Sequence, residues 1–261
     1  MKMESISHQK EKEIASKLLE MRTKTEVSRF LEEIFKNSEG NFKWVPVGGK
    51  LDNARSIELT TEQAPPLVER ITNSIDALIE LCEADIPEDQ PRPPSPREAA
   101  ERWFSVPKGH LENLSNEKIQ ELASNIKVEI CESENQHAPT ILIVDKGIGQ
   151  HPLDFEKTIV SLGESNKWGK HFLCGAYGQG GSSTLWWSEY TIIISHRRPK
   201  HNRGRTDLVG WTVVRKNREN LEYKTTVYEY LVNNDGSVPT LSPSALEGLG
   251  FEFRTYVAHI Q

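Results

Sequence analysis

The feature that most constrains the fold is a short aliphatic run, residues 141–144 (ILIV), that ends at Asp145. Four consecutive aliphatic residues are far fewer than the roughly 20 that a membrane span needs, and they predict a strand buried on both faces. The next residues, Lys146-Gly147-Ile148-Gly149, favour a turn. The chain must therefore build a sheet around this strand, with a carboxylate at its end, where ligands bind at a sheet edge.

The order of the other patterns indicates the fold class. Helical periodicity comes first along the chain and strand patterns come last. Helices are expected over residues 8–37, 63–83, 97–104, 116–124 and 153–162, and strands over residues 127–131, 140–145, 190–195, 208–215, 221–232 and 251–257. This order predicts an α+β protein: a two-layer α/β sandwich with a mixed, mostly antiparallel sheet covered by helices on one face.

The 261 residues leave room for one large domain or two small ones. We expect an N-terminal helical segment over residues 1–40 and the main domain over residues 41–261. A proline-rich insertion interrupts the main domain near residues 85–125. Within it, residues 85–96 hold five prolines and exclude both a helix and a central strand.

The composition excludes several classes of protein. A net charge of −6 argues against a protein that coats nucleic acid or an anionic membrane through its overall charge. The three cysteines, Cys82, Cys131 and Cys174, are far apart and form no CxxC pair, which excludes a disulfide scaffold and a cysteine zinc site. Because no secretion signal or membrane-length apolar stretch is present, a cytoplasmic protein without membrane contact is expected.

The first motif with chemical content lies in the helix expected over residues 63–83. At 100° per residue, Glu69, Asn73, Asp76 and Glu80 fall within about 60° of one another on one face. A carboxylate one turn from a carboxamide can place a general base beside a magnesium ligand. The alternative is a helix with a solvated polar face.

The second motif is Asp145-Lys146-Gly147-Ile148-Gly149, directly after the aliphatic run. A carboxylate at this point can accept a hydrogen bond from an exocyclic amine such as that of adenine. The two glycines allow close approach of a ligand or a positive φ. A plain strand-to-turn transition remains the alternative.

The third motif is a glycine-rich segment over residues 175–183 (GAYGQGGSS), preceded by Ser165-Asn166-Lys167. Four glycines in seven residues before a helix start provide backbone N–H groups that favour phosphate. The segment lacks the Gly-Lys-Ser/Thr of a P-loop and the GxGxxG of a dinucleotide fold. Its alternative is a flexible surface loop.

Together, in this order, the three motifs resemble those of the GHKL (Bergerat-fold) ATPase superfamily, which includes gyrase B, MutL, MORC proteins, ninety-kilodalton heat-shock chaperones and sensor histidine kinases. The segment from Glu69 to Ala77 resembles the N-box, Asp145 to Gly149 resembles the adenine-binding motif, and residues 175–181 resemble the lid glycines. The resemblance covers roughly residues 60–195. It implies ATP and Mg²⁺ as cofactors.

Carried onto this sequence, the resemblance implies Glu69 as the general base for the attacking water and Asn73 as the Mg²⁺ ligand. It implies Asp145 as the partner of the adenine amine, with Gly147 and Gly149 passing under the base. The remaining residues implied to bind the nucleotide are Asp76 (through water), Lys167, Gly175, Gly178, Gln179, Gly180, Gly181 and Ser182.

The implied function is Mg²⁺-dependent ATP binding and hydrolysis, coupled to lid closure and to homodimerisation or engagement of a partner protein. The alternative is a non-hydrolysing nucleotide-binding sensor or scaffold module. Hydrolytic members often take a lysine from a following transducer domain, for which the chain has no room. The expected module is therefore either the N-terminal part of a larger DNA-linked or anti-phage defence system or an ATPase that relies on a partner. The dipeptide Gly-Thr that opens a late strand in this superfamily is missing, with Gly250-Phe251 nearest to it.

A basic segment over residues 196–205 carries the only concentrated positive charge outside the glycine-rich region. It holds five cations and no acid, which predicts contact with nucleic-acid phosphates. The alternative is a solvated loop tip. The five candidate DNA-binding residues are Arg197, Arg198, Lys200, Arg203 and Arg205.

Overall fold

The structure is a computed structural model that describes residues 2–37, 41–57, 62, 64–135, 137–162, 169–175, 183–220, 225–251 and 253–261. Its α-helices are α1 (Lys2–Glu20), α2 (Lys24–Asn37), α3 (Ala54–Ile57), α4 (Ala64–Ala84), α5 (Pro96–Phe104) and α6 (Asn116–Ala123). Its strands are β1 (Phe42–Pro46), β2 (Ile126–Cys131), β3 (Thr140–Asp145), β4 (Tyr190–His196), β5 (Val209–Asn220), β6 (Thr225–Asn233), β7 (Thr240–Leu241) and β8 (Thr255–Ile260). Short 3₁₀ helices lie between them, among them η4 (Pro152–Lys157) and η5 (Leu185–Trp187).

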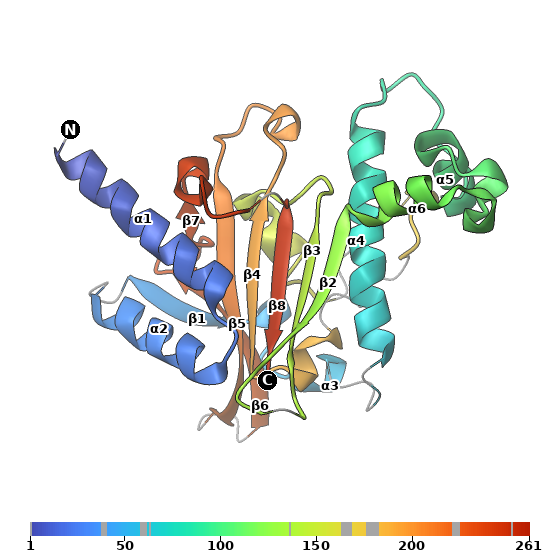
Figure 1. Cartoon of the computed structure of the whole chain (residues 1–261). Coiled ribbons are helices and arrows are strands. Elements are labelled where there is room, and N and C mark those ends of the chain that lie inside the picture. Colours follow the sequence, from blue (N-terminus) through green and yellow to red (C-terminus); the bar gives the residue numbers. More distant parts are fainter. Residues whose placement is uncertain are drawn as a thin grey trace.

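The strands form one sheet in the order β1-β6-β5-β4-β8-β3-β2, with β7 paired to β5 (Figure 1). Every pairing among the described residues is antiparallel, so the expected mixed sheet is wrong in this respect. The last strand, β8, lies in the middle of the sheet between β3 and β4. It thereby joins the part of the sheet that carries the second motif to the strands of the C-terminal half, and the protein is α+β.

Helices cover both faces of the sheet, and the expectation of helices on one face is therefore wrong. On one face α1 and α2 lie across the strands (Figure 1), and Leu18 and Phe30 belong to a core with Leu142, Ile192 and Trp211. The reason is in β3 itself, since a strand that is apolar on both sides needs cover on both sides.

The opposite face packs against α4 near β3 and β2 and against shorter elements elsewhere. A second core joins Ile57 of α3, Phe155 of η4 and Leu185 of η5 to the sheet residues Ile193 and Val257. The helix expected over residues 153–162 is only the 3₁₀ helix η4, and the strand expected over residues 251–257 begins and ends later, as β8.

The proline-rich insertion packs back onto α4 as a lobe (Figure 1). Ile79 of α4 and Ala99 of α5 form a small core with Phe172 and Leu173, and the ring of Trp103 lies edge-on to that of Phe172 at 5.4 Å. This lobe therefore contacts the segment that leads into the third motif.

Arg92 holds the extended connector at the start of the lobe. Its guanidinium donates to the carbonyls of Ile86, Pro87 and Gln90 and pairs with Glu83 at 3.1 Å. Because prolines donate no backbone hydrogen bonds, a side chain supplies the donors that fix this segment.

None of the helices in the described part of the chain has the length and apolar character that crossing a bilayer requires.

We expect Leu18→Ala, at a side chain of α1 that is 0% exposed, to lower the free energy of unfolding by about 2–5 kcal/mol, because it leaves a cavity between α1 and the sheet. Urea denaturation followed by tryptophan fluorescence measures this. The matched control is Leu111→Ala, whose side chain is 60% exposed and should change stability little. A loss as small as the control's would show that α1 contributes nothing to the stability of the sheet.

Candidate functional site

Helix α4 turns its polar face inward. Asp76 is 1% exposed, Ser74 4% and Arg70 8%, whereas the apolar side chains of Val68 and Ile75 are 61% and 39% exposed. Of the polar face expected from the sequence, Asp76 is buried while Glu69, Asn73 and Glu80 are partly exposed, so that face is solvated only in part. Burying polar groups is unfavourable unless they find partners, so the inner side of α4 is built around specific contacts.

Asp145 lies at the end of β3, beneath α4, and is 4% exposed. Its Oδ1 accepts a hydrogen bond from the N–H of Gly147 at 2.9 Å, and the Ser74 hydroxyl also bonds to the carboxylate. Burial raises the pKa of Asp145 to about 7, although these hydrogen bonds and the charge of Arg70 act in the opposite direction. A buried carboxylate that titrates near neutrality is typical of a functional site.

The two glycines of the second motif are required by close packing. A Cβ on Gly147 would lie 2.6 Å from the Cβ of Ala77 in α4, and the N–H of Ile148 donates to the Ala77 carbonyl at 3.0 Å. Gly149 has a φ of +69°, and a Cβ there would lie 2.2 Å from the carbonyl oxygen of His196. The first and second motifs are therefore in direct backbone contact at Ala77.

Asp76 brings the third motif to the same place. Its carboxylate accepts hydrogen bonds from the backbone N–H of Cys174 at 2.7 Å and of Gly175 at 3.0 Å. This contact places the first residue of the glycine-rich motif against α4. The other sequence-predicted residues of this motif, Lys167, Gly178, Gln179, Gly180, Gly181 and Ser182, lie outside the described residues.

Glu69 and Asn73 lie on the first half of α4 and are partly exposed. They stand on the same side of the helix as Asp76, which lies further along the helix and holds Gly175. The face that the sequence predicted is thus a continuous polar surface, with its start open to solvent and its middle buried.

Sequence reasoning missed Arg70, which is buried between α4 and the sheet. Its Nη2 donates to the Thr184 hydroxyl at 3.2 Å, and its charge acts on both Glu69 and Asp145. Burial lowers the pKa of Arg70 to about 10, and the two carboxylates oppose that shift. The helical repeat is the sequence signal that could have shown this. Arg70 lies four residues before Ser74, so both side chains lie on the same, inward side of α4.

His259, in the middle of β8, was also missed. Its Nδ1 lies 3.3 Å from the Ser188 hydroxyl and 3.2 Å from that of Thr191, and its ring lies 5.1 Å from that of Trp187. Burial, with the positive charge of Arg70 as the second cause, holds the pKa of His259 well below its usual range. A neutral imidazole therefore continues the buried polar layer below α4.

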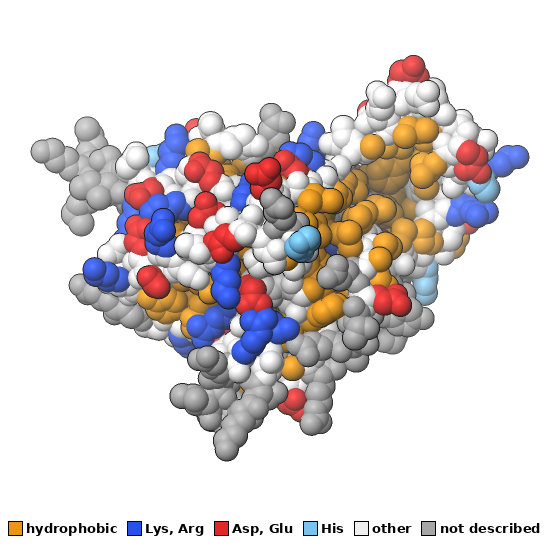
Figure 2. Space-filling model, turned by 60° about the horizontal axis from the view of Figure 1, so that its bottom comes forward, with side chains coloured by type: hydrophobic (Ala, Val, Ile, Leu, Met, Phe, Trp, Pro, Cys, Tyr) orange, Lys and Arg blue, Asp and Glu red, His pale blue; other side chains and the backbone are white. Residues whose placement is uncertain are grey.

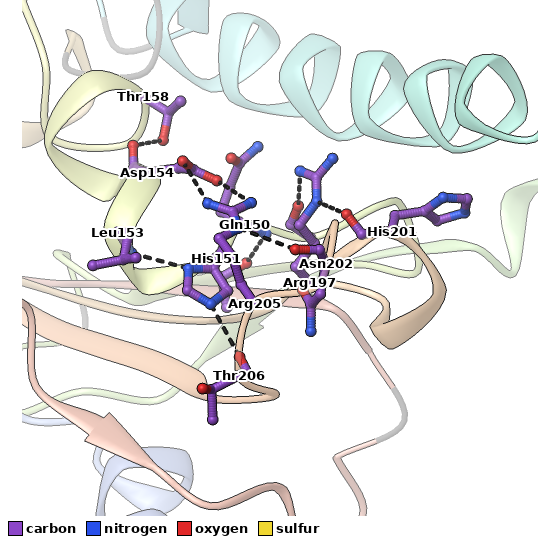
Figure 3. Close-up of polar contacts among 12 residues, drawn as sticks. Gln150, His151, Leu153, Asp154, Thr158, Arg197, His201, Asn202, Arg205 and Thr206 are labelled. Atoms are coloured by element: carbon purple, nitrogen blue, oxygen red, sulfur yellow. Dashed lines mark hydrogen bonds and ion pairs between the residues drawn. The ribbon is translucent and has the colours of Figure 1, made fainter.

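The basic segment over residues 196–205 lies against the second motif at its start, while Lys200 and Arg203 at its tip are exposed. Arg198 donates to the carbonyls of Lys146 at 2.7 Å and Gly147 at 3.2 Å. Arg197 donates to the carbonyl of His201 at 3.0 Å (Figure 3). Arg197 also donates to the Gly149 carbonyl at 3.5 Å, so two of the five predicted DNA-binding cations hold the backbone of the second motif.

Two more of these cations are paired with acids. Arg205 pairs with Asp154 at 3.0 Å, and Figure 3 shows the two side chains turned toward each other; Lys200 pairs with Asp85 at 2.5 Å. Arg203, with a φ of 53°, shares the lining of a cavity of about 870 Å³ with Lys170 and with the acids of the last turns of α4. Two of the five cations are therefore neutralised by ion pairs, and Arg203 lines a cavity in which cations outnumber acids.

Comparison of the sequence with models of protein families gives no match, and comparison with curated proteins gives no significant one.

The raised pKa of Asp145 makes stability depend on pH. Because the folded state binds the proton more tightly than the unfolded state, stability falls as pH rises from about 4 to about 7, by up to about 4 kcal/mol. We expect Asp145→Asn, which cannot titrate, to gain stability relative to the parent over this interval.

Urea denaturation at a series of pH values measures this difference, with exposed Asp89→Asn as the control for loss of a surface carboxylate. A difference between Asp145→Asn and the parent that stays constant from pH 4 to 7 would contradict the raised pKa.

Proposed function

We propose that the chain binds and hydrolyses ATP with Mg²⁺, as a GHKL-type ATPase. The observation that carries the proposal is the meeting of three sequence-distant motifs on adjacent residues of one helix. Ala77 contacts Gly147 and Ile148, and Asp76 binds the backbone of Gly175. The second and third motifs are distant from α4 in the sequence, yet both contact the same turn of this helix. This shared contact supports a common function of the three motifs.

The adenine end of the proposed site is Asp145. Its carboxylate is a buried acceptor with one oxygen already bonded to Gly147, which supports recognition of a base that offers an exocyclic amine. The contact of Gly147 with Ala77 fixes the loop after β3 against α4, next to Asp145, and Gly147 has no side chain that would obstruct a base there. These residues fit an adenine, and Arg198 fixes the same loop from the other side.

The phosphate end is the first half of α4. We assign Glu69 as the general base that takes the proton of the attacking water, and Asn73 as the residue whose amide oxygen holds Mg²⁺. The ion would neutralise phosphate charge and orient the phosphates. In this proposal the phosphates complete the coordination of the ion that Asn73 holds.

Asp76 has a second role in the proposal, as the anchor of the lid. By accepting the N–H groups of Cys174 and Gly175, it fixes the point from which the glycine-rich segment extends. In this proposal, closure of that segment over the nucleotide would start at this contact. Dimerisation or engagement of a partner protein would follow from the closure. A role in DNA-linked or anti-phage defence extends the same proposal.

We expect Glu69→Gln to lower the rate of hydrolysis by a factor of about 10² or more, because the amide cannot accept the proton of the attacking water. ATP binding should persist. Phosphate release in a single turnover and equilibrium binding of ATP measure the two effects. The control is Glu32→Gln, an exposed carboxylate on α2. Hydrolysis at the parental rate would contradict the assignment of Glu69, and a parent that binds ATP without cleaving it would favour a sensor or scaffold.

We expect Asp145→Asn to weaken ATP binding by roughly 5- to 150-fold, equivalent to about 1–3 kcal/mol, because the adenine amine loses its charged acceptor. The parent should also prefer ATP to GTP, since guanine carries an oxygen where adenine carries the amine. Isothermal titration calorimetry measures both, with Asp89→Asn as the control. Equal affinities of parent and variant for ATP would remove Asp145 from the site.

A further inference from the structure

Strand β2 forms a free edge of the sheet. It is the last strand in the order of the sheet, and no described segment pairs with its outer side (Figure 1). Edge strands offer unpaired backbone N–H and C=O groups to another chain, and native proteins normally protect them. The side chains of β2 therefore indicate which kind of partner can cover this edge.

One face of β2 is apolar and exposed. Val128 is 44% exposed and Ile130 73%, and both lie on the side of the sheet that faces α4, because they pair with Ile143 and Ile141 of β3. Figure 2 shows a broad, hollowed hydrophobic area on the side of the molecule that carries α4, α5 and α6. The exposed large apolar side chains on α4, on α6, on β2 and on the connection between α5 and α6 are Val68, Ile75, Ile119, Val128, Ile130 and Leu111.

The other face of β2 is charged, with one residue of each sign. Lys127 and Glu129 alternate with the apolar residues and pair with each other at 2.5 Å, with side-chain exposures of 54% and 42%. Within a single chain these two charges lie side by side along the same strand. When a strand pairs with the outer edge, each of them would exchange this ion pair within the strand for one across the two strands.

We propose that β2 pairs antiparallel with β2 of a second copy of this chain, on a two-fold axis at Val128. A two-fold axis perpendicular to a continuous sheet pairs only residues of the same face, so the axis must pass through a residue. Centred on Val128, the pairing sets Lys127 opposite Glu129 of the other copy twice, and Ile126 opposite Ile130 twice. Centred on Lys127 or Glu129, it would set like charges opposite each other.

The charge pattern thus selects both the occupant and the register. A self-complementary strand of this kind fits a second copy better than an arbitrary partner, because the five residues from Ile126 to Ile130 pair among themselves across the axis. The two-fold axis also brings the exposed apolar sides of the two α4 helices onto the same face of the joined sheet. The inference does not depend on the proposed ATPase activity.

Charge reversal tests the register. We expect Lys127→Glu, and separately Glu129→Lys, to raise the dissociation constant of the dimer by about tenfold, because each places two like-charged pairs across the interface. The double variant Lys127→Glu/Glu129→Lys should recover the parental value. Analytical ultracentrifugation over a range of concentrations measures this, and circular dichroism verifies that each variant is folded.

The matched controls are Lys10→Glu on α1 and Glu32→Lys on α2, which are exposed and carry the same changes of charge. They should leave the dissociation constant unchanged. A monomeric parent at every concentration would overturn the proposal, and so would a dimer that is insensitive to both reversals at β2.

Cross-linking tests the position of the axis. In a Cys131→Ser background, Val128→Cys should form a covalent dimer under mild oxidation, since residue 128 of each copy lies opposite its equivalent. Ile130→Cys should not, because the two copies of residue 130 would be about 13 Å apart. Equal cross-linking of the two variants would overturn the register.

The dimer should form equally with and without Mg²⁺ and ATP, because the outer edge of β2 carries none of the residues proposed to bind the nucleotide, although Ile126 pairs with Asp145 on the inner edge. Glu69→Gln and Asp145→Asn should therefore dimerise like the parent, even if the proposed function fails. A dimer that forms only with nucleotide would overturn the pairing through β2, while leaving the proposed ATPase intact.

Discussion

The contact on which the rest of the structure depends is that between α4 and the loop after β3. Gly147 lies so close to Ala77 that no side chain fits between them, and the Ile148 N–H binds the same residue of α4. This contact fixes the height of α4 above the sheet, and thus the depth at which Asp145 is buried. The pKa of Asp145 near 7 follows from that depth.

The layer between α4 and the sheet is polar where a globular protein normally has an apolar core. Arg70, Asp145 and His259 are all buried there, and their partners are hydroxyls and backbone N–H groups. Such a layer is stable only while its members remain paired, so it also makes the arrangement specific. The apolar side of α4, in turn, faces outward and forms part of the surface beside β2.

Loops that are remote in sequence support the same contact. The basic segment after β4 surrounds the second motif with guanidinium groups, and the insertion lobe packs onto the segment leading to Gly175. Both features look like independent modules in the sequence. In the structure they hold the position of the candidate site.

The sequence alone determined the strand at residues 140–145, helix α4, and the polar set Glu69, Asn73, Asp76 and Asp145, because periodicity and chain order are local properties. Cover on both sides of β3 also followed from its aliphatic run, although the expected one-sided sandwich ignored it. Only the tertiary structure decided which side of α4 points inward, that Arg70 and His259 share one buried layer, and that the cations near residue 200 are paired. Those outcomes depend on the balance between desolvation and pairing of groups more than 50 residues apart, which no local pattern encodes.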